Sequence, residues 1–157
     1  GSLRGRKMAI VGDILHSRVA RSDIYAFSKV GVQVVVSGPR SLVPLHVFDL
    51  AECEPDVRKA VTGAALVSAL RVRRERQVEG LFPSIDEYHI QCGINEEVPT
   101  HASKEAVVMH PGPMNRGVEI DSFVADGDRC LVLDQVKSGV AVRMALLFLY
   151  LAGGGDR

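Results

Sequence analysis

Arginine residues follow three of the apolar runs in this sequence, each a short distance after the run ends. Arg18, Arg71 and Arg116 follow different runs, and Arg73 lies just beyond Arg71. The planar guanidinium group binds a carboxylate or a phosphate through two parallel hydrogen bonds. If the apolar runs form parallel strands, these arginines gather beyond the carboxyl ends of the strands, where open α/β sheets bind ligands. The pattern therefore predicts a site for a small molecule that carries more than one anionic group.

Each of these features also has a structural interpretation. The pair Gly12-Asp13 is equally well explained as a turn between a strand and a helix, and the run Arg71–Arg76 (RVRRER) resembles a solvated charged face. A cation at Arg18, at the start of a predicted helix, is unfavourable for the helix macrodipole, which argues for a function there. Two prolines around Gly112 fix a rigid corner, which a simple turn also explains. Together, at successive strand ends, these features favour a binding site.

Five segments are predicted as strands and four as helices. The apolar runs are continuous rather than alternating, which is typical of strands covered on both faces of a parallel sheet. The predicted strands are Lys7–Gly12, Val32–Gly38, Ala65–Leu70, Ala106–His110 and Cys130–Gln135. The predicted helices are Arg18–Val30, which Gly31 would stop, a short helix within Asp49–Thr62, one opened by a capping box at Ser84–Glu87, and Ser138–Ala152.

The alternation of these elements predicts one α/β domain over residues 1–157. Its sheet is expected to be doubly wound, mainly parallel, five-stranded and Rossmann-like, with helices on both faces. Residues 71–99 carry few strand signals and many charges, so they are predicted as long loops around one short helix.

The composition excludes several classes of protein. Lys plus Arg and Asp plus Glu number 19 each, so net charge indicates neither nucleic acid nor a membrane surface as a partner. The stretch Val140–Ala152 is interrupted by Arg143 and too short to span a bilayer. The three cysteines are widely spaced and form no CxxC pattern. They predict free thiols in a cytoplasmic protein.

Motifs of other chemistries are missing from the sequence. It contains neither the GxGxxG dinucleotide fingerprint nor a phosphate-binding GxxxxGK[ST] loop, and no GxSxG supports a serine nucleophile. The five histidines lack HxxH or HExxH spacing, so neither a metal nor another cofactor is predicted. His110, near a strand end, is predicted to be a hydrogen-bonded structural histidine rather than a catalytic base.

Both ends of the chain look cut. The first predicted strand begins almost at the first residue, with no element before it. The last predicted helix is apolar on nearly all sides, more than one sheet can cover. We therefore expect a partner domain or subunit to cover it.

Four ordered motifs resemble the aspartate carbamoyltransferase family. They begin with Met8–Ser22 (MAIVGDILHSRVARS), which resembles the start of the family's aspartate-binding domain, and continue with Leu70–Arg76, which resembles its aspartate loop. His110–Ile120 (HPGPMNRGVEI) is the most specific match, and Gln135–Ala145 completes the series. The resemblance covers essentially the whole chain.

The resemblance implies roles for six residues. Arg18 and Arg71 match the arginines that grip the two carboxylates of L-aspartate, and Arg73, where the family usually has glutamine, is assigned with them. Pro111, Gly112 and Pro113 match the corner whose backbone approaches carbamoyl phosphate. In such enzymes the aspartate amino group attacks the carbamoyl carbon and phosphate leaves, without a cofactor, so no catalytic residue is assigned within this chain.

The resemblance also implies partners. The family's carbamoyl-phosphate-binding domain is absent from this sequence, so we expect the chain alone to be inactive. Intact relatives are expected to be homotrimers, in some cases with regulatory subunits or dihydroorotase. One alternative is a non-catalytic amino-acid-binding or assembly module with the same fold. Another is an ornithine-type enzyme, which carries a cysteine-containing motif where this chain has His110–Pro113.

Overall fold

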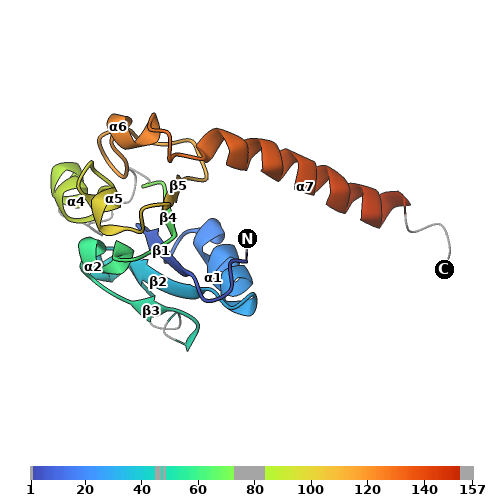
Figure 1. The fold of residues 1–157 in the computed structure, drawn as a ribbon, viewed down its shortest axis with the longest axis horizontal. Helices are drawn as coiled ribbons and strands as arrows, with labels where there is room; N and C mark the ends of the chain where they lie inside the picture. Colours follow the sequence, from blue (N-terminus) through green and yellow to red (C-terminus); the bar gives the residue numbers. More distant parts are fainter. Residues whose placement is uncertain (1, 45–46, 48, 73–83, 153–157) are drawn as a thin grey trace.

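Five parallel strands form one sheet in the computed structural model, which describes residues 2–44, 47, 49–72 and 84–152. The strands are β1 (Lys7–Val11), β2 (Gln33–Ser37), β3 (Glu52–Cys53), β4 (Leu66–Ala69) and β5 (Val107–Met109). They are arranged in the order β3-β2-β1-β4-β5 with parallel pairing (Figure 1). The order runs in opposite directions on either side of β1, so the predicted doubly wound sheet is confirmed.

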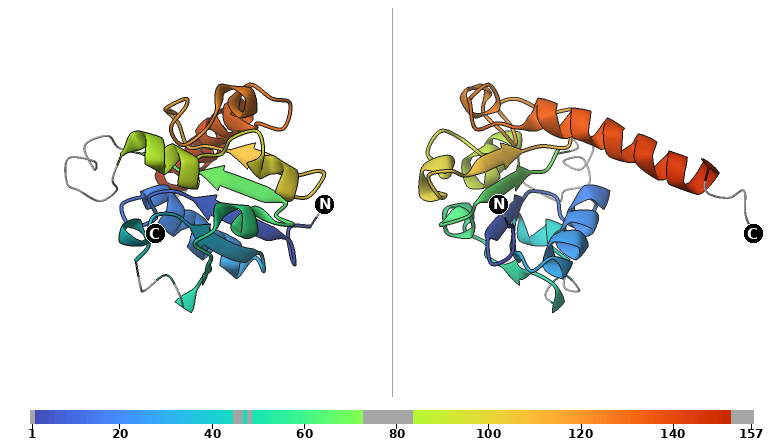
Figure 2. Two further views of the ribbon diagram at one scale, coloured as in Figure 1. Left: turned by 90° about the vertical axis from the view of Figure 1, so that its left-hand side faces the viewer. Right: turned by 45° about the vertical axis from the view of Figure 1, so that its right-hand side comes forward.

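Helices cover both faces of this sheet (Figure 2). Successive residues of a strand point to opposite faces, so β1 supplies Met8 and Ile10 to one apolar layer and Ala9 and Val11 to the other. Ile24 packs in the first layer from α1. This double burial explains the continuous apolar runs. The first layer holds α1 (Arg18–Lys29), and the second holds α2 (Val57–Val61), α4 (Ile85–Cys92), α5 (Val98–His101) and α6 (Ser122–Ala125).

Capping residues set the helix boundaries that the sequence predicts. The Ser17 hydroxyl accepts a hydrogen bond from the Ala20 amide at 3.0 Å and begins α1. Gly31, with φ of +84°, follows the end of that helix in the left-handed region. The Ser84 hydroxyl accepts from the Glu87 amide at 3.0 Å and begins α4. The predicted stop at Gly31 and the predicted start at Ser84 are therefore confirmed, whereas the cap at Ser17 was not predicted.

The predicted fifth strand at Cys130–Gln135 is wrong. Only Cys130 forms an isolated bridge, to Val108, and α7 (Val132–Ala152) begins two residues later instead of at Ser138. A short apolar run fits either a buried strand or a buried helical turn, so periodicity could not separate the two. The fifth strand is instead β3, at the opposite edge, whose two residues are too few to give a sequence signal.

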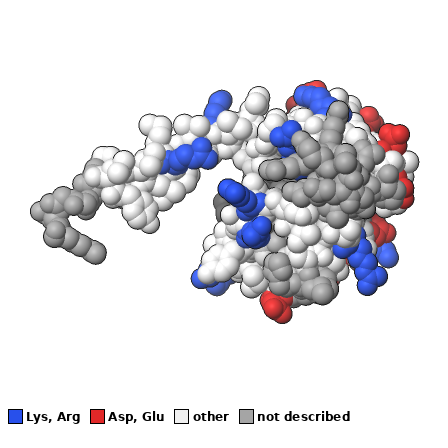
Figure 3. Space-filling view, turned by 180° about the vertical axis from the view of Figure 1, so that it is seen from behind, with Lys and Arg blue, Asp and Glu red and all other residues white. Residues whose placement is uncertain are grey.

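Helix α7 leaves the body of the domain after its first turn (Figure 1). Val132 is buried, but Phe148, Tyr150 and Leu151 are 70%, 81% and 79% exposed. The helix is mainly white in the space-filling view, with a few cations (Figure 3). Among the residues that the structure describes, no helix, α7 included, is long and apolar enough to cross a membrane.

The ends of β1 and β2 approach too closely for a side chain at Gly38. A Cβ there would overlap the carbonyl oxygen of Gly12, because the Gly12 amide donates to the Ser37 carbonyl at 2.8 Å. We predict that Gly38→Ala lowers the free energy of unfolding by about 1–3 kcal/mol, measured by urea denaturation. The matched control is Gly139→Ala, which meets no atom within 4 Å and lies in α7, where alanine favours helix. Equal stability of the two variants would contradict the prediction.

Candidate functional site

One pocket of about 430 Å³ lies beyond the carboxyl ends of β1, β4 and β5. It collects residues from three separate parts of the sequence, each of which follows one of these strands. Arg18 and Arg71 both line it, so the sheet brings together two guanidinium groups that are remote in sequence. The lining residues are Asp13, His16, Ser17, Arg18, Val19, Arg71, Pro111 and Gly112.

The turn between β1 and α1 forms one wall of the pocket. Gly12 has φ of +129°, and a Cβ there would lie 3.0 Å from the Tyr88 hydroxyl, so the turn requires glycine. The buried Asp13 carboxylate accepts from the His16 amide at 3.0 Å and contacts the His16 Nδ1 at 2.9 Å. The turn that the structural interpretation of Gly12-Asp13 predicts is present, while Asp13 also lines the pocket, and the same turn orients the His16 imidazole there.

The amino terminus of α1 adds a second source of positive potential. The first backbone N–H groups of a helix have no partner inside the helix, and the macrodipole places partial positive charge there. Ser17, Arg18 and Val19, which begin α1, all line the pocket. No acidic side chain lies in this first turn. A helix start with a cation and without an anion is arranged to attract an anionic ligand.

The corner after β5 forms another wall of the pocket. Gly112 has φ of +63°, and the Gly112–Pro113 peptide bond is cis. The Gly112 amide donates to the His110 Nδ1 at 2.9 Å. Pro111 and Gly112 line the pocket, whereas Pro113 is exposed and is not among the lining residues.

A buried ion lies behind this corner. His110 and Glu119 are 0% and 1% exposed, and the His110 Nε2 lies 3.2 Å from the Glu119 Oε1. Because the Gly112 amide must donate to Nδ1, the imidazole proton is on Nε2, and the ring donates to the carboxylate. Burial alone would raise the pKa of Glu119, but hydrogen bonds from His110 and Asn115 outweigh it and hold the pKa below its ordinary value. The prediction that His110 is hydrogen-bonded is confirmed.

Arg116 is not among the described residues that line the pocket. The Arg116 guanidinium binds both oxygens of the Asp126 carboxylate at 2.6 and 2.7 Å. Arg73 lies outside the described residues. Asp13 and His16 also line the pocket, although they were not predicted from the sequence as site residues. The feature of the sequence that could have indicated them is their spacing of three residues, which lets the two side chains meet within one turn. Over the described ranges, no three His, Cys, Asp or Glu side chains gather as metal ligands would.

Comparisons with known proteins cover the whole domain. Residues 4–150 match the family model described as aspartate/ornithine carbamoyltransferase, Asp/Orn binding domain. The chain is 51% identical over 157 residues to a protein of Opitutus terrae named aspartate carbamoyltransferase catalytic subunit, covering 99% of this chain and 49% of that protein. A protein of the same name from Pelotomaculum thermopropionicum is 52% identical over 159 residues, with 100% and 51% covered. The chain thus spans about half the length of these relatives.

Solved structures support the same assignment. The ornithine carbamoyltransferase from Pyrococcus furiosus has a TM-score of 0.83 at 27% identity, covering 98% of this chain and 52% of that chain. The enzyme of the same name from Burkholderia thailandensis has a TM-score of 0.76 at 26% identity, covering 98% and 50%. Sequence and fold agree, and the chain therefore belongs to the aspartate/ornithine carbamoyltransferase family, whose Asp/Orn-binding domain it matches over nearly its entire length.

Proposed function

We propose that this chain supplies the L-aspartate half of an aspartate carbamoyltransferase site, for the carbamoylation step of pyrimidine synthesis. The observation that carries the proposal is the pocket that Arg18 and Arg71 line together with Gly112. Two guanidinium groups match the two carboxylates of L-aspartate in number and in charge. The relatives that share about half of all residues with this chain are named aspartate carbamoyltransferases.

In this proposal the two reactants meet across the pocket. Arg18 and Arg71, with Arg73, hold the carboxylates of L-aspartate, while Pro111, Gly112 and Pro113 approach carbamoyl phosphate through their backbone. The aspartate amino group attacks the carbamoyl carbon, the bond from that carbon to the phosphate oxygen breaks, and phosphate leaves. The amino group loses a proton in the process. No side chain of this domain is assigned as a catalyst, because positioning and charge stabilisation can supply most of the rate enhancement.

Ornithine is the competing substrate, because the similar solved structures are named ornithine carbamoyltransferases. Its side chain ends in an ammonium group, which a second guanidinium would repel. Arg71 as well as Arg18 lines the pocket in which the ligand is proposed to bind. Charge therefore favours a dicarboxylate over a diamino acid.

The remainder of the site would come from a second domain. The relatives are about twice as long as this chain, and we infer that their other half binds the phosphate of carbamoyl phosphate. The exposed apolar side chains of α7 are a suitable surface for it, since a helix that is apolar all round is normally covered. Three copies would then assemble into a cytoplasmic homotrimer, with or without regulatory subunits or dihydroorotase.

A non-catalytic amino-acid-binding module is the second candidate. It would use the same pocket and the same two arginines, Arg18 and Arg71. The two candidates differ in whether a carbamoyl-phosphate-binding chain restores turnover, since a binding module would still bind L-aspartate but would never form carbamoyl-aspartate.

Removal of one guanidinium group tests the aspartate site. We predict that Arg18→Gln weakens binding of L-aspartate at least about tenfold, because a hydrogen bond to a charged group contributes about 1.5–3 kcal/mol. Isothermal titration calorimetry of the 157-residue chain with L-aspartate and with L-ornithine measures this. The matched control is Arg21→Gln, which removes an exposed arginine of the same helix that does not line the pocket. Tighter binding of L-ornithine than of L-aspartate would reverse the substrate assignment.

Turnover tests the need for a second domain. We predict that the purified chain forms no carbamoyl-aspartate from L-aspartate and carbamoyl phosphate, because half of the proposed site is missing. Addition of the separately expressed other half of the Opitutus terrae relative should restore product, measured by colorimetric detection of carbamoyl-aspartate. Product from this chain alone would refute the division of the site. Aspartate binding without any restored product would favour the binding module.

A further inference from the structure

We propose that Glu119 is a positioning residue that fixes the distance between two segments that line the pocket. These are the segment after β4 that carries Arg71 (the Arg71 wall) and the corner after β5 that carries Gly112 (the Gly112 wall). The proposal rests on the function proposed above, because it concerns the same site. Glu119 lies behind the pocket and does not line it. Any effect on a ligand must therefore pass through the backbone that Glu119 holds.

Sheet pairing stops before it reaches either wall. The β4–β5 ladder runs from the pair Leu66–Val107 to the pair Ser68–Met109. Arg71 and Gly112 each lie three residues beyond this last pair. Beyond this last pair, the two described segments that lead to Arg71 and to Gly112 have no ladder hydrogen bonds between them. Other hydrogen bonds must therefore keep these segments at a defined distance from each other.

One oxygen of Glu119 holds the Gly112 wall. The Glu119 Oε1 accepts from the His110 Nε2 at 3.2 Å and from the Asn115 amide. The His110 Nδ1 in turn accepts from the Gly112 amide at 2.9 Å. The corner is therefore connected to the carboxylate through a single imidazole ring.

The other oxygen holds the Arg71 wall. The Glu119 Oε2 accepts from the Val72 amide at 3.4 Å and from the Asn115 Nδ2 at 3.1 Å. The same Nδ2 donates to the Val72 carbonyl at 2.8 Å. Both backbone groups of Val72, the neighbour of Arg71, are thus held by Glu119 and Asn115.

A carboxylate is needed because both of its oxygens accept. All four donors to Glu119 are N–H groups, two of the backbone and two of side chains, and they divide between its two oxygens. A glutamine of the same shape has one accepting oxygen and one donating NH₂ group. If the NH₂ group faces Val72, the Arg71 wall loses its acceptor. If it faces His110, the Gly112 wall loses its acceptor instead.

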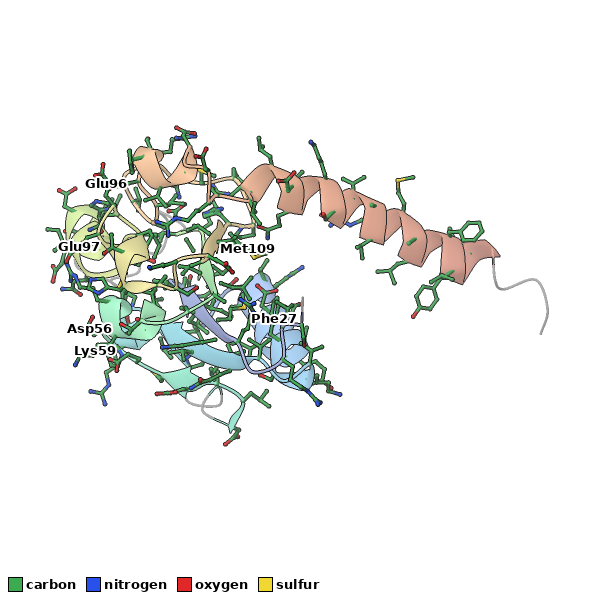
Figure 4. The ribbon with its side chains drawn as sticks, viewed as in Figure 1. Phe27, Asp56, Lys59, Glu96, Glu97 and Met109 are labelled. Atoms are coloured by element: carbon green, nitrogen blue, oxygen red, sulfur yellow. The ribbon has the colours of Figure 1, made fainter. Side chains whose placement is uncertain are left out.

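The test compares Glu119→Gln with wild type in the full 157-residue chain. We expect the variant to bind L-aspartate at least about tenfold more weakly in calorimetric titration, because one wall is released. Nitrogen-15 NMR should show shifts at the Val72 or Gly112 amide and a changed pattern for the His110 ring. The control is Glu97→Gln, the same exchange at an exposed carboxylate that forms an ion pair with Arg58 at 2.9 Å. Glu97 lies on the side of the domain away from α7, where Figure 4 labels it. This control should bind as wild type does.

The affinity of the folded variant for L-aspartate distinguishes a positioning role of Glu119 from a role in stability alone. A purely structural role would lower the melting temperature without changing that affinity, and unchanged affinity alongside shifted Val72 or Gly112 amides would overturn the proposal. If Glu119→Gln reduces the folded fraction, Asn115→Ala decides the question, since it removes only the two Nδ2 bonds and should also weaken binding. If wild type itself fails to bind L-aspartate, the proposed function fails and this inference falls with it.

Discussion

Parallel pairing of β1 with β4 is the constraint on which the candidate site depends. The register runs from Met8–Leu66 to Val11–Ala69, so the two strands end side by side and their following residues face one pocket. A slip of one residue would turn every side chain of a strand to the other face. The two apolar layers, which bury Met8 and Ile10 on one face and Ala9 on the other, exclude that slip. Core packing thereby positions the two guanidinium groups.

The polar groups behind the pocket follow a second physical rule. A buried carboxylate is costly unless hydrogen bonds replace the water that it loses. Glu119 is 1% exposed, and imidazole and amide donors surround its two oxygens. A carboxylate stabilised by these hydrogen bonds also fixes the positions of the groups that donate them. The hydrogen bonds that offset the cost of burying the Glu119 carboxylate also connect the segments that follow β4 and β5, where the two strands are no longer paired.

Helix α7 forms although no other part of the described domain covers most of its length. Its residues from Val136 to Leu151 are exposed, and they include large apolar side chains such as Phe148 and Leu151. Helix propensity and backbone hydrogen bonds can form such a helix, but burial normally stabilises it. The half-length match to the relatives and this uncovered surface are both accounted for by a second domain in the proposed enzyme.

Local patterns in the sequence were enough to predict most of the elements. Apolar runs indicated β1, β2, β4 and β5, Gly31 indicated the end of α1, and the capping box at Ser84 indicated the start of α4. Strand burial and helix capping could be predicted because they depend on neighbours a few residues away. The same reasoning failed at Cys130–Gln135, where a short apolar run begins a helix, and at β3, whose two residues carry no pattern.

The sequence by itself determined the α/β class, the caps and the arginines available at strand ends. Only the tertiary structure decided which of these arginines meet: Arg18 and Arg71 share a pocket, while Arg116 is occupied by Asp126. It alone revealed that Glu119 connects His110 with Val72. The physical reason is distance along the chain. A capping bond forms within one turn, whereas a shared pocket or a buried hydrogen bond between remote residues exists only after the sheet has brought their backbones together.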